Sequence, residues 1–190
     1  MDFKSELQMK LIKEAINVWA IENFLDLETC NDLITEMEST GYFEESLYAS
    51  PIEKKFDITN RLFFKSEEFA EIIWNNIKEY VPRKYHERYT SIGVNEQFRL
   101  YKYFKGQVFE SHQDSPCIRN ENERSFYSLL IYFNDNFKGG ETIFENLSIK
   151  PKVGKAVFFP HTLIHSGALV IEGSKYILRT DIMYRLNVNL

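Results

Sequence analysis

The second half of the chain consists of short runs rich in β-branched and aromatic residues, separated by turn residues. Glycine or asparagine marks most of these turns, as at Lys105-Gly106 and Lys138-Gly139-Gly140. No helical period alternates with the runs, so an antiparallel barrel or sandwich is favoured over parallel βαβ units. The runs predict strands at 97–104, 107–112, 125–133, 142–144, 155–159, 163–171 and 175–185.

The first half has a different pattern. Apolar residues at helical spacing predict helices over 5–20, 28–40 and 66–80, and residues 42–65 predict a loop with a short strand at 61–64. A chain of 190 residues is long enough for one domain with a substantial core. We therefore expect a single α+β domain over 1–190, in which helical and lid segments (1–95) brace a strand-built core (96–186).

Charge and composition limit the partners. The net charge of −5 predicts no nucleic-acid partner, and no apolar run is long enough for a membrane span. The N-terminus carries acidic residues and does not resemble a signal peptide. Cys30 and Cys117 lie far apart and outside any C-x-x-C spacing, which predicts free thiols in a reducing, cytoplasmic compartment. The oligomeric state is left open.

One pair of residues suggests a metal site. His112 and Asp114 lie two apart, so in a strand both side chains would project from one face, about 6.6 Å apart along the strand. A third ligand must come from another strand, and we favour His165 over His161, which Pro160 places in a turn. Two histidines and one carboxylate are typical of non-haem Fe(II) oxygenases, and zinc would accept the same set. His86 lies in a charged run and is expected at the surface or behind the ligands.

Three stretches carry a family resemblance over about residues 97–186. YFKGQVFESHQD resembles the Y-x-x-G-Q-x-Y/F-x-x-H-x-D segment of the prolyl 4-hydroxylase group of 2-oxoglutarate- and Fe(II)-dependent dioxygenases. SLLIYFNDNFKGGETIF is similar to that group's strand and G-G-E-T-x-F element, and HSGALVIEGSKYILRTDIMYR resembles its closing stretch. The resemblance implies a double-stranded β-helix, or cupin-like jelly roll, that binds Fe(II) through His112, Asp114 and His165. It also implies 2-oxoglutarate and O₂ as co-substrates, with ascorbate as an optional addition.

The same resemblance implies a set of co-substrate residues. Lys175, ten residues after His165, occupies the family position that pairs with the far carboxylate of 2-oxoglutarate. Arg179 is the rival for this role, or else pairs with Asp181 on the same strand face. The remaining candidates are Tyr132 and Thr142, which could hydrogen-bond the same carboxylate, and Tyr103, which could face co-substrate or substrate; each could instead be a packed core residue.

The implied reaction is hydroxylation of a C–H bond, most simply of a prolyl residue in a peptide or protein. Segments 115–124 and 44–65 would frame the substrate groove. Arg179 and Asp181 stand where the peptidyl-prolyl enzymes usually carry Thr and Trp, so a polar small molecule or another residue type is the alternative substrate. A catalytically silent metal-binding module is a second alternative, and a nucleic-acid demethylase, which the negative charge disfavours, is a third.

Overall fold

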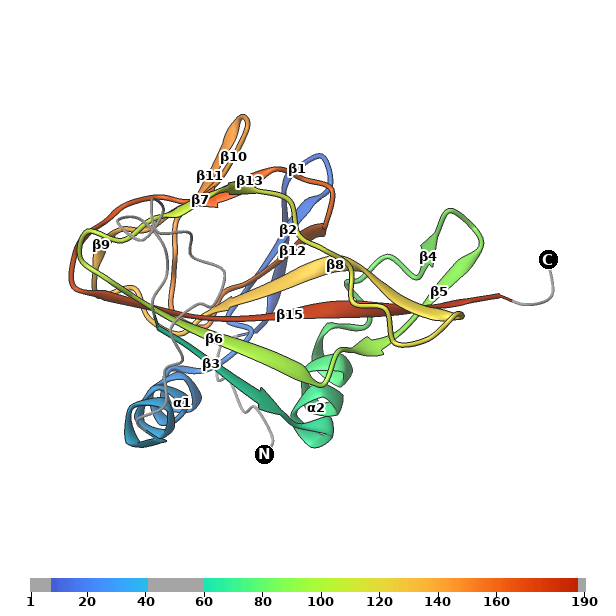
Figure 1. Ribbon diagram of the computed structural model, residues 1–190, viewed down its shortest axis with the longest axis horizontal. Helices are drawn as coiled ribbons and strands as arrows, with labels where there is room; N and C mark the ends of the chain where they lie inside the picture. The colour runs from blue at the N-terminus through green and yellow to red at the C-terminus, as the bar shows by residue number, and fades with distance from the viewer. Residues whose placement is uncertain (1–7, 41–59, 188–190) are drawn as a thin grey trace.

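The computed structural model of the protein describes residues 8–40 and 60–187. Strands predominate, and two helices accompany them within these ranges (Figure 1). The elements are β1 (Lys10–Ala15), β2 (Val18–Glu22), α1 (Leu27–Thr40), β3 (Asn60–Lys65), α2 (Glu67–Ile77), β4 (Lys84–Tyr85), β5 (Tyr89–Val94), β6 (Gln97–Phe104), β7 (Phe109–His112), β8 (Glu123–Tyr132), β9 (Lys138–Gly139), β10 (Thr142–Phe144), β11 (Leu147–Ile149), β12 (Ala156–Pro160), β13 (His165–Gly167), β14 (Val170–Glu172) and β15 (Ser174–Leu186).

The described strands form a large sheet, a small sheet and a two-stranded sheet of β14 and β9. The large sheet has the order β1-β2-β12-β8-β15-β5-β4, with β6 paired to both β15 and β3, and the small sheet has the order β11-β10-β13-β7. The pairings among the described strands are antiparallel. The small sheet lies on one side of the large sheet and both helices lie on the other (Figure 1). This is the α+β jelly roll that the sequence predicted.

The large sheet is buried on both faces. In β8, Leu129 and Ile131 belong to the apolar cluster that includes residues of α1 and α2, whereas Leu130 and Tyr132 belong to a second cluster that includes Phe144 of the small sheet. Successive strand residues point to opposite faces, so a strand covered on both sides reads as the continuous apolar run seen here. The face toward the small sheet carries the candidate site.

The two helices begin at recognisable caps. Ser66 accepts a hydrogen bond of 3.1 Å from the N–H of Phe69 at the start of α2, and Asp26 accepts one of 2.6 Å from the N–H of Thr29 at the start of α1. The buried face of α2 carries Ala70, Ile73 and Ile77. The helices predicted at 28–40 and 66–80 are therefore confirmed, within the few residues by which helix ends vary.

The helix predicted at 5–20 is wrong. Residues 10–22 form the hairpin β1–β2, whose turn includes Asn17 in the left-handed region (φ 66°). Pairing of β2 with β12 adds the hairpin to the large sheet, and Trp19 stacks on Phe158 with ring centroids 5.2 Å apart. Because this pairing joins distant parts of the chain, it overrides a local pattern that suits a helix.

Further strands lie where none was predicted. β4 and β5 were missed, so the region 1–95 contributes more strand than the sequence indicated. The strand predicted at 163–171 is divided into β13 and β14, and β3 is slightly longer than the predicted 61–64. Most of the segment predicted as a lid at 44–65 lies outside the described residues. No helix in the described part of the chain has the length and apolar character to cross a membrane.

Candidate metal centre and co-substrate pocket

Three predicted ligand residues converge between the two sheets. His112 ends β7 and His165 begins β13, and the two residues are partners across these strands, with ring centroids 4.3 Å apart. Asp114 follows β7; its Oδ1 lies 3.6 Å from Nε2 of His112 and its Oδ2 lies 3.7 Å from Nε2 of His165. Two atoms that each bind one ion at about 2.1 Å are at most about 4.2 Å apart, so both separations suit a shared metal.

Hydrogen bonds to the backbone orient both imidazole rings. Nδ1 of His112 lies 2.8 Å from the Glu110 carbonyl, and Nδ1 of His165 lies 3.1 Å from the Leu163 carbonyl. A carbonyl only accepts, so in the neutral rings the proton is on Nδ1 and the lone pair of each Nε2 faces Asp114. The two Nε2 atoms and the Asp114 carboxylate are all electron-pair donors, and no hydrogen lies between them. A cation placed among them would bind all three, so this group fits a divalent metal.

Asp114 is held in its charged form. Burial alone would raise the pKa of its carboxyl, but the charge of Arg179 and the hydrogen bond from Ser128 hold that pKa well below the usual range. Nη2 of Arg179 lies 2.8 Å from Asp114 Oδ1. An ionised carboxylate is the form that binds metals.

The other histidines are differently placed. Both ring nitrogens of His161 contact serine hydroxyls, at 2.8 Å for Nδ1 to Ser128 and 2.7 Å for Nε2 to Ser125. Burial lowers the pKa of His161 to about 4, so the ring is neutral at pH 7. His161 therefore does not present a ring nitrogen to the three converging residues. His86 lies exposed in the turn between β4 and β5, as expected.

Lys175 lies on β15 and is buried. It pairs in register with Tyr103 of β6, and its Nζ lies 5.2 Å from the Tyr103 ring centre and 5.5 Å from that of Tyr132. Nζ donates a 2.7 Å hydrogen bond to the Gly140 carbonyl. The residue is 3% exposed, and burial lowers its pKa to about 7, against the opposing charge of Glu141. Within the described residues Lys175 forms no ion pair, so an anion would complete its surroundings.

Two further candidates lie beside this lysine. The hydroxyls of Tyr132 and Thr142 are 2.6 Å apart and both side chains are buried. Burial raises the pKa of Tyr132, so its phenol is neutral and can donate a hydrogen bond. Tyr103, Tyr132 and Thr142 thus lie with Lys175, whereas Arg179 contacts Asp114 and lies 3.4 Å from Asp181.

Comparison with known proteins shows what this chain resembles. Residues 97–180 match the family model described as the 2OG-Fe(II) oxygenase superfamily. Over this part of its length the chain is similar to that superfamily. A protein of Acanthamoeba polyphaga mimivirus described as a putative prolyl 4-hydroxylase is 31% identical over 103 residues, which are 43% of this chain and 42% of that protein. The match thus spans less than half of the length of this curated relative.

Solved structures share the fold of this protein. The viral collagen prolyl hydroxylase of Paramecium Bursaria Chlorella virus-1, in complex with 2OG, superposes with a TM-score of 0.64 at 22% identity, over 90% of this chain and 97% of that one. A Pseudomonas putida prolyl-4-hydroxylase gives 0.61 at 11% identity, over 90% and 93%. A Trichoplax adhaerens prolyl hydroxylase, solved with a peptide fragment of the hypoxia inducible factor oxygen degradation domain, gives 0.65 at 14% identity, over 90% and 83%.

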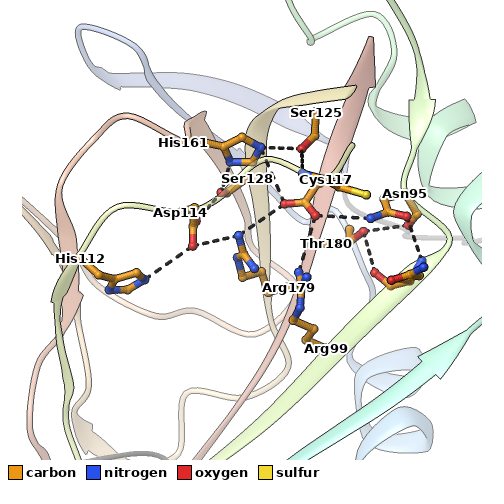
Figure 2. A network of polar contacts seen from close by, with 12 residues as sticks. Asn95, Arg99, His112, Asp114, Cys117, Ser125, Ser128, His161, Arg179 and Thr180 are labelled. Carbon is orange, nitrogen blue, oxygen red and sulfur yellow. Dashed lines mark hydrogen bonds and ion pairs between the residues drawn. The ribbon is translucent and has the colours of Figure 1, made fainter. Parts of the chain in front are cut away.

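Some polar residues near the candidate metal centre were not identified from the sequence. Ser125 and Ser128 are fully buried in β8 and contact His161, and Ser128 also donates to Asp114 (Figure 2). The available signal was two small polar residues within a strand that is otherwise apolar. Segment 115–124, predicted as a lid, is held by Arg119, which lies 3.1 Å from Glu123 and also contacts Glu96.

Proposed function

We propose that the protein is a dioxygenase dependent on Fe(II) and 2-oxoglutarate that hydroxylates a C–H bond, most simply of a prolyl residue in a peptide or protein. The observation that carries this proposal is the convergence of His112, Asp114 and His165, with both imidazole lone pairs directed at the carboxylate. The match of residues 97–180 to the 2OG-Fe(II) oxygenase superfamily supports the choice of metal and co-substrate.

In this proposal His112, Asp114 and His165 hold Fe(II) on one side and leave its other positions open. Bound iron, 2-oxoglutarate and O₂ together supply the oxidation, in which the keto acid is converted to succinate and CO₂. The protein residues bind and orient these reactants. The backbone carbonyls of Glu110 and Leu163 keep the Nε2 atoms of the two histidines free of hydrogen.

Lys175 is proposed to bind the far carboxylate of 2-oxoglutarate, and Tyr132, Thr142 and Tyr103 to line the same end. Its burial supports this role, because an ammonium group without an ion pair gains most from an anionic ligand. Arg179 is less suited to it, because its guanidinium already contacts the Asp114 carboxylate.

The metal assignment is tested by measuring succinate formed from 2-oxoglutarate with added Fe(II). We expect His112→Ala and Asp114→Ala to abolish iron-dependent turnover, since each removes one of three ligands. Unchanged turnover in either variant would refute the ligand assignment. Stoichiometric metal binding by the wild type without any succinate formation would instead favour a silent metal-binding module. Omitting O₂ or ascorbate from the same assay tests both requirements.

A prolyl substrate is supported by the descriptions of the similar proteins, one of which was solved with a peptide. Arg179 and Asp181 favour the alternative of a polar small molecule or another residue type, because both are charged residue types with little exposure and Arg179 contacts the candidate ligand Asp114. Mass spectrometry of proline-containing peptides after turnover distinguishes these substrates. Hydroxylation of a peptide whose prolines are replaced by alanine would argue against proline as the target.

The predicted cytoplasmic location remains a proposal. It is supported by Cys30 and Cys117, which are both free thiols in the structure. Fractionation of the cells that produce the protein would test it.

A further inference from the structure

A chain of buried polar groups leads to Asp114 from behind (Figure 2). Ser128 Oγ donates to Asp114 Oδ2 and lies 2.8 Å from Nδ1 of His161. Nε2 of the same ring lies 2.7 Å from Ser125 Oγ, which accepts a 2.8 Å hydrogen bond from the backbone N–H of Cys117. Both serines are 0% exposed and His161 is 5% exposed, so water does not compete for these contacts.

The number of available hydrogens fixes the direction of each hydrogen bond in this series of polar groups. A carboxylate only accepts, so the single hydrogen of the Ser128 hydroxyl points to Asp114. Ser128 must then accept from His161, which places the proton of the neutral ring on Nδ1. Nε2 is left as an acceptor and takes the hydrogen of Ser125. Hence every donor, from the Cys117 amide onward, points toward Asp114.

The backbone makes the same connection. The N–H of Asp114 donates to the His161 carbonyl at 3.1 Å, and the N–H of His161 donates to the Phe126 carbonyl at 3.0 Å. Asp114 lies beyond the last residue of β7 and therefore has no strand partner of its own. Both the main chain and the side chain of His161 thus connect this position to β8 in the large sheet.

Buried polar groups generally satisfy one another, and a chain of this kind could serve stability alone. This chain ends on an oxygen of a candidate metal ligand. We propose that Ser128 and His161 are positioning residues that orient the Asp114 carboxylate for metal binding. The inference rests on the proposed function, because it assigns Asp114 as a ligand. Partners behind a metal ligand typically change metal affinity 10- to 100-fold when removed.

The test measures Mn(II) affinity of the metal-free full-length protein, from the EPR signal of free Mn(II). Ser128→Ala should weaken binding about 10- to 100-fold. Ser125→Ala, which removes only the outer contact, should have a smaller effect. A Mn(II) affinity of Ser128→Ala within about threefold of the wild-type value would overturn the inference, because this change is smaller than removal of such a partner normally causes. Failure of the wild type itself to bind would instead refute the proposed function.

Two substitutions of His161 form a matched pair. Asparagine places an amide nitrogen near the Nδ1 position and can still donate to Ser128, whereas glutamine places its amide near Nε2, beside Ser125. We expect His161→Asn to keep most of the Mn(II) affinity and His161→Gln to lose it. Equal affinity in the two variants would contradict a positioning role, since a purely structural effect would not follow the donor position.

A measurement on the wild type covers the case in which the variants fail to fold. Two-bond ¹H–¹⁵N correlation spectra report which nitrogen of a neutral histidine carries the proton. With the His161 signals assigned by their loss in His161→Asn, or by elimination against the other three histidines, we expect the Nδ1–H tautomer. An Nε2–H tautomer would reverse the direction of the chain and overturn the inference.

Discussion

The ammonium group of Lys175 lies among two aromatic rings and one carbonyl, where its charge is poorly solvated. Because the pKa of Lys175 is lowered to about 7, its amine is partly charged and partly neutral at neutral pH before 2-oxoglutarate binds. Only the charged form pairs with a carboxylate. Binding of 2-oxoglutarate should therefore draw a proton onto Lys175 whenever the pH exceeds the pKa of the empty state.

We predict that the affinity for 2-oxoglutarate, measured calorimetrically on the Mn(II)-loaded protein, falls as the pH rises above about 7. The decrease should approach about tenfold per pH unit, because one proton must be taken up for each molecule bound. Lys175→Arg keeps its charge at every accessible pH and should flatten the profile. An equally steep profile in Lys175→Arg would assign the dependence to another group.

Gly140 is the second residue on which the lysine pocket depends. Its φ of 70° is unfavourable for residues with a side chain, and an added Cβ would lie 2.9 Å from Phe137 Cε2 and 3.2 Å from Lys175 Cδ. Gly140→Ala should lower the free energy of unfolding by about 1–3 kcal/mol. It should also weaken 2-oxoglutarate binding, because it displaces Lys175.

The matched control for this substitution is Gly93→Ala. Its added Cβ would meet nothing within 4 Å, so the free energy of unfolding should change by less than about 0.5 kcal/mol. Urea denaturation and calorimetric titration of both variants check the pair. Normal 2-oxoglutarate binding by a folded Gly140→Ala variant would contradict the proposal that the turn at Gly140 positions Lys175.

Among the elements, α2 stabilises the fold from the face of the large sheet opposite the small sheet (Figure 1). The Ser66 side chain accepts a hydrogen bond from the N–H of Phe69, which lies in the first turn and would otherwise lack a partner within the helix. Ser66→Ala should therefore lower the free energy of unfolding by about 1 kcal/mol. Ser66→Asp should keep most of the stabilisation that the cap contributes, since aspartate also caps helices well.

The turnover of 2-oxoglutarate should be unchanged in both Ser66 variants, because the cap touches none of the candidate site residues. Urea denaturation and the succinate assay together check this. A fall in turnover at a temperature where Ser66→Ala is fully folded would show that the helix and the pocket are coupled.

Some helices and strands could be predicted from the sequence and others could not. The longer strands beyond residue 96 were predictable because β-branched and aromatic runs alternate with turn residues, whereas the short strands β9 and β11 were not predicted. The caps at Asp26 and Ser66 agree with local helix preferences. The β1–β2 hairpin was not, because Ile12 and Trp19 suit a helical pattern equally well and only pairing with β12 decides the structure.

The candidate site divides in the same way. The spacing of His112 and Asp114, with a family resemblance, was enough to select His165, because strand spacing is visible in the sequence. The contact of Ser128 with both Asp114 and His161 joins the ends of separate strands, and nothing local predicts it. The sequence also left Lys175 and Arg179 as rivals, whereas in the structure Lys175 contacts the Gly140 carbonyl and Arg179 contacts Asp114.

At the scale of the whole molecule, the candidate ligands lie where the two sheets meet. His112 and His165 belong to the small sheet, and Asp114 is connected through Ser128 to β8 of the large sheet. Lys175, on β15 of the large sheet, donates to the Gly140 carbonyl beside the small sheet's β10. A metal and a dicarboxylate bound between these groups would therefore join the two sheets at both ends of the pocket.

We accordingly predict a stepwise gain in thermal stability. Mn(II) at about 100 times its Kd should add about 2.7 kcal/mol, which corresponds to a rise in Tm of roughly 5–10 °C for a chain of this size. 2-Oxoglutarate should raise the Tm further, but only after Mn(II), because the metal completes its binding site. Scanning calorimetry of the protein alone, with each ligand, and with both checks the order.

Two variants separate the contributions to this stability. Asp114→Asn should lose the Mn(II) shift and with it the 2-oxoglutarate shift, whereas Lys175→Ala should keep the first and lose most of the second. This asymmetry follows from the geometry, since Asp114 lies with the candidate metal ligands, whereas Lys175 contacts Gly140 and the rings of Tyr103 and Tyr132. A full shift from 2-oxoglutarate without metal would mean that the dicarboxylate binds elsewhere, and the two sheets would then not be joined through the proposed centre.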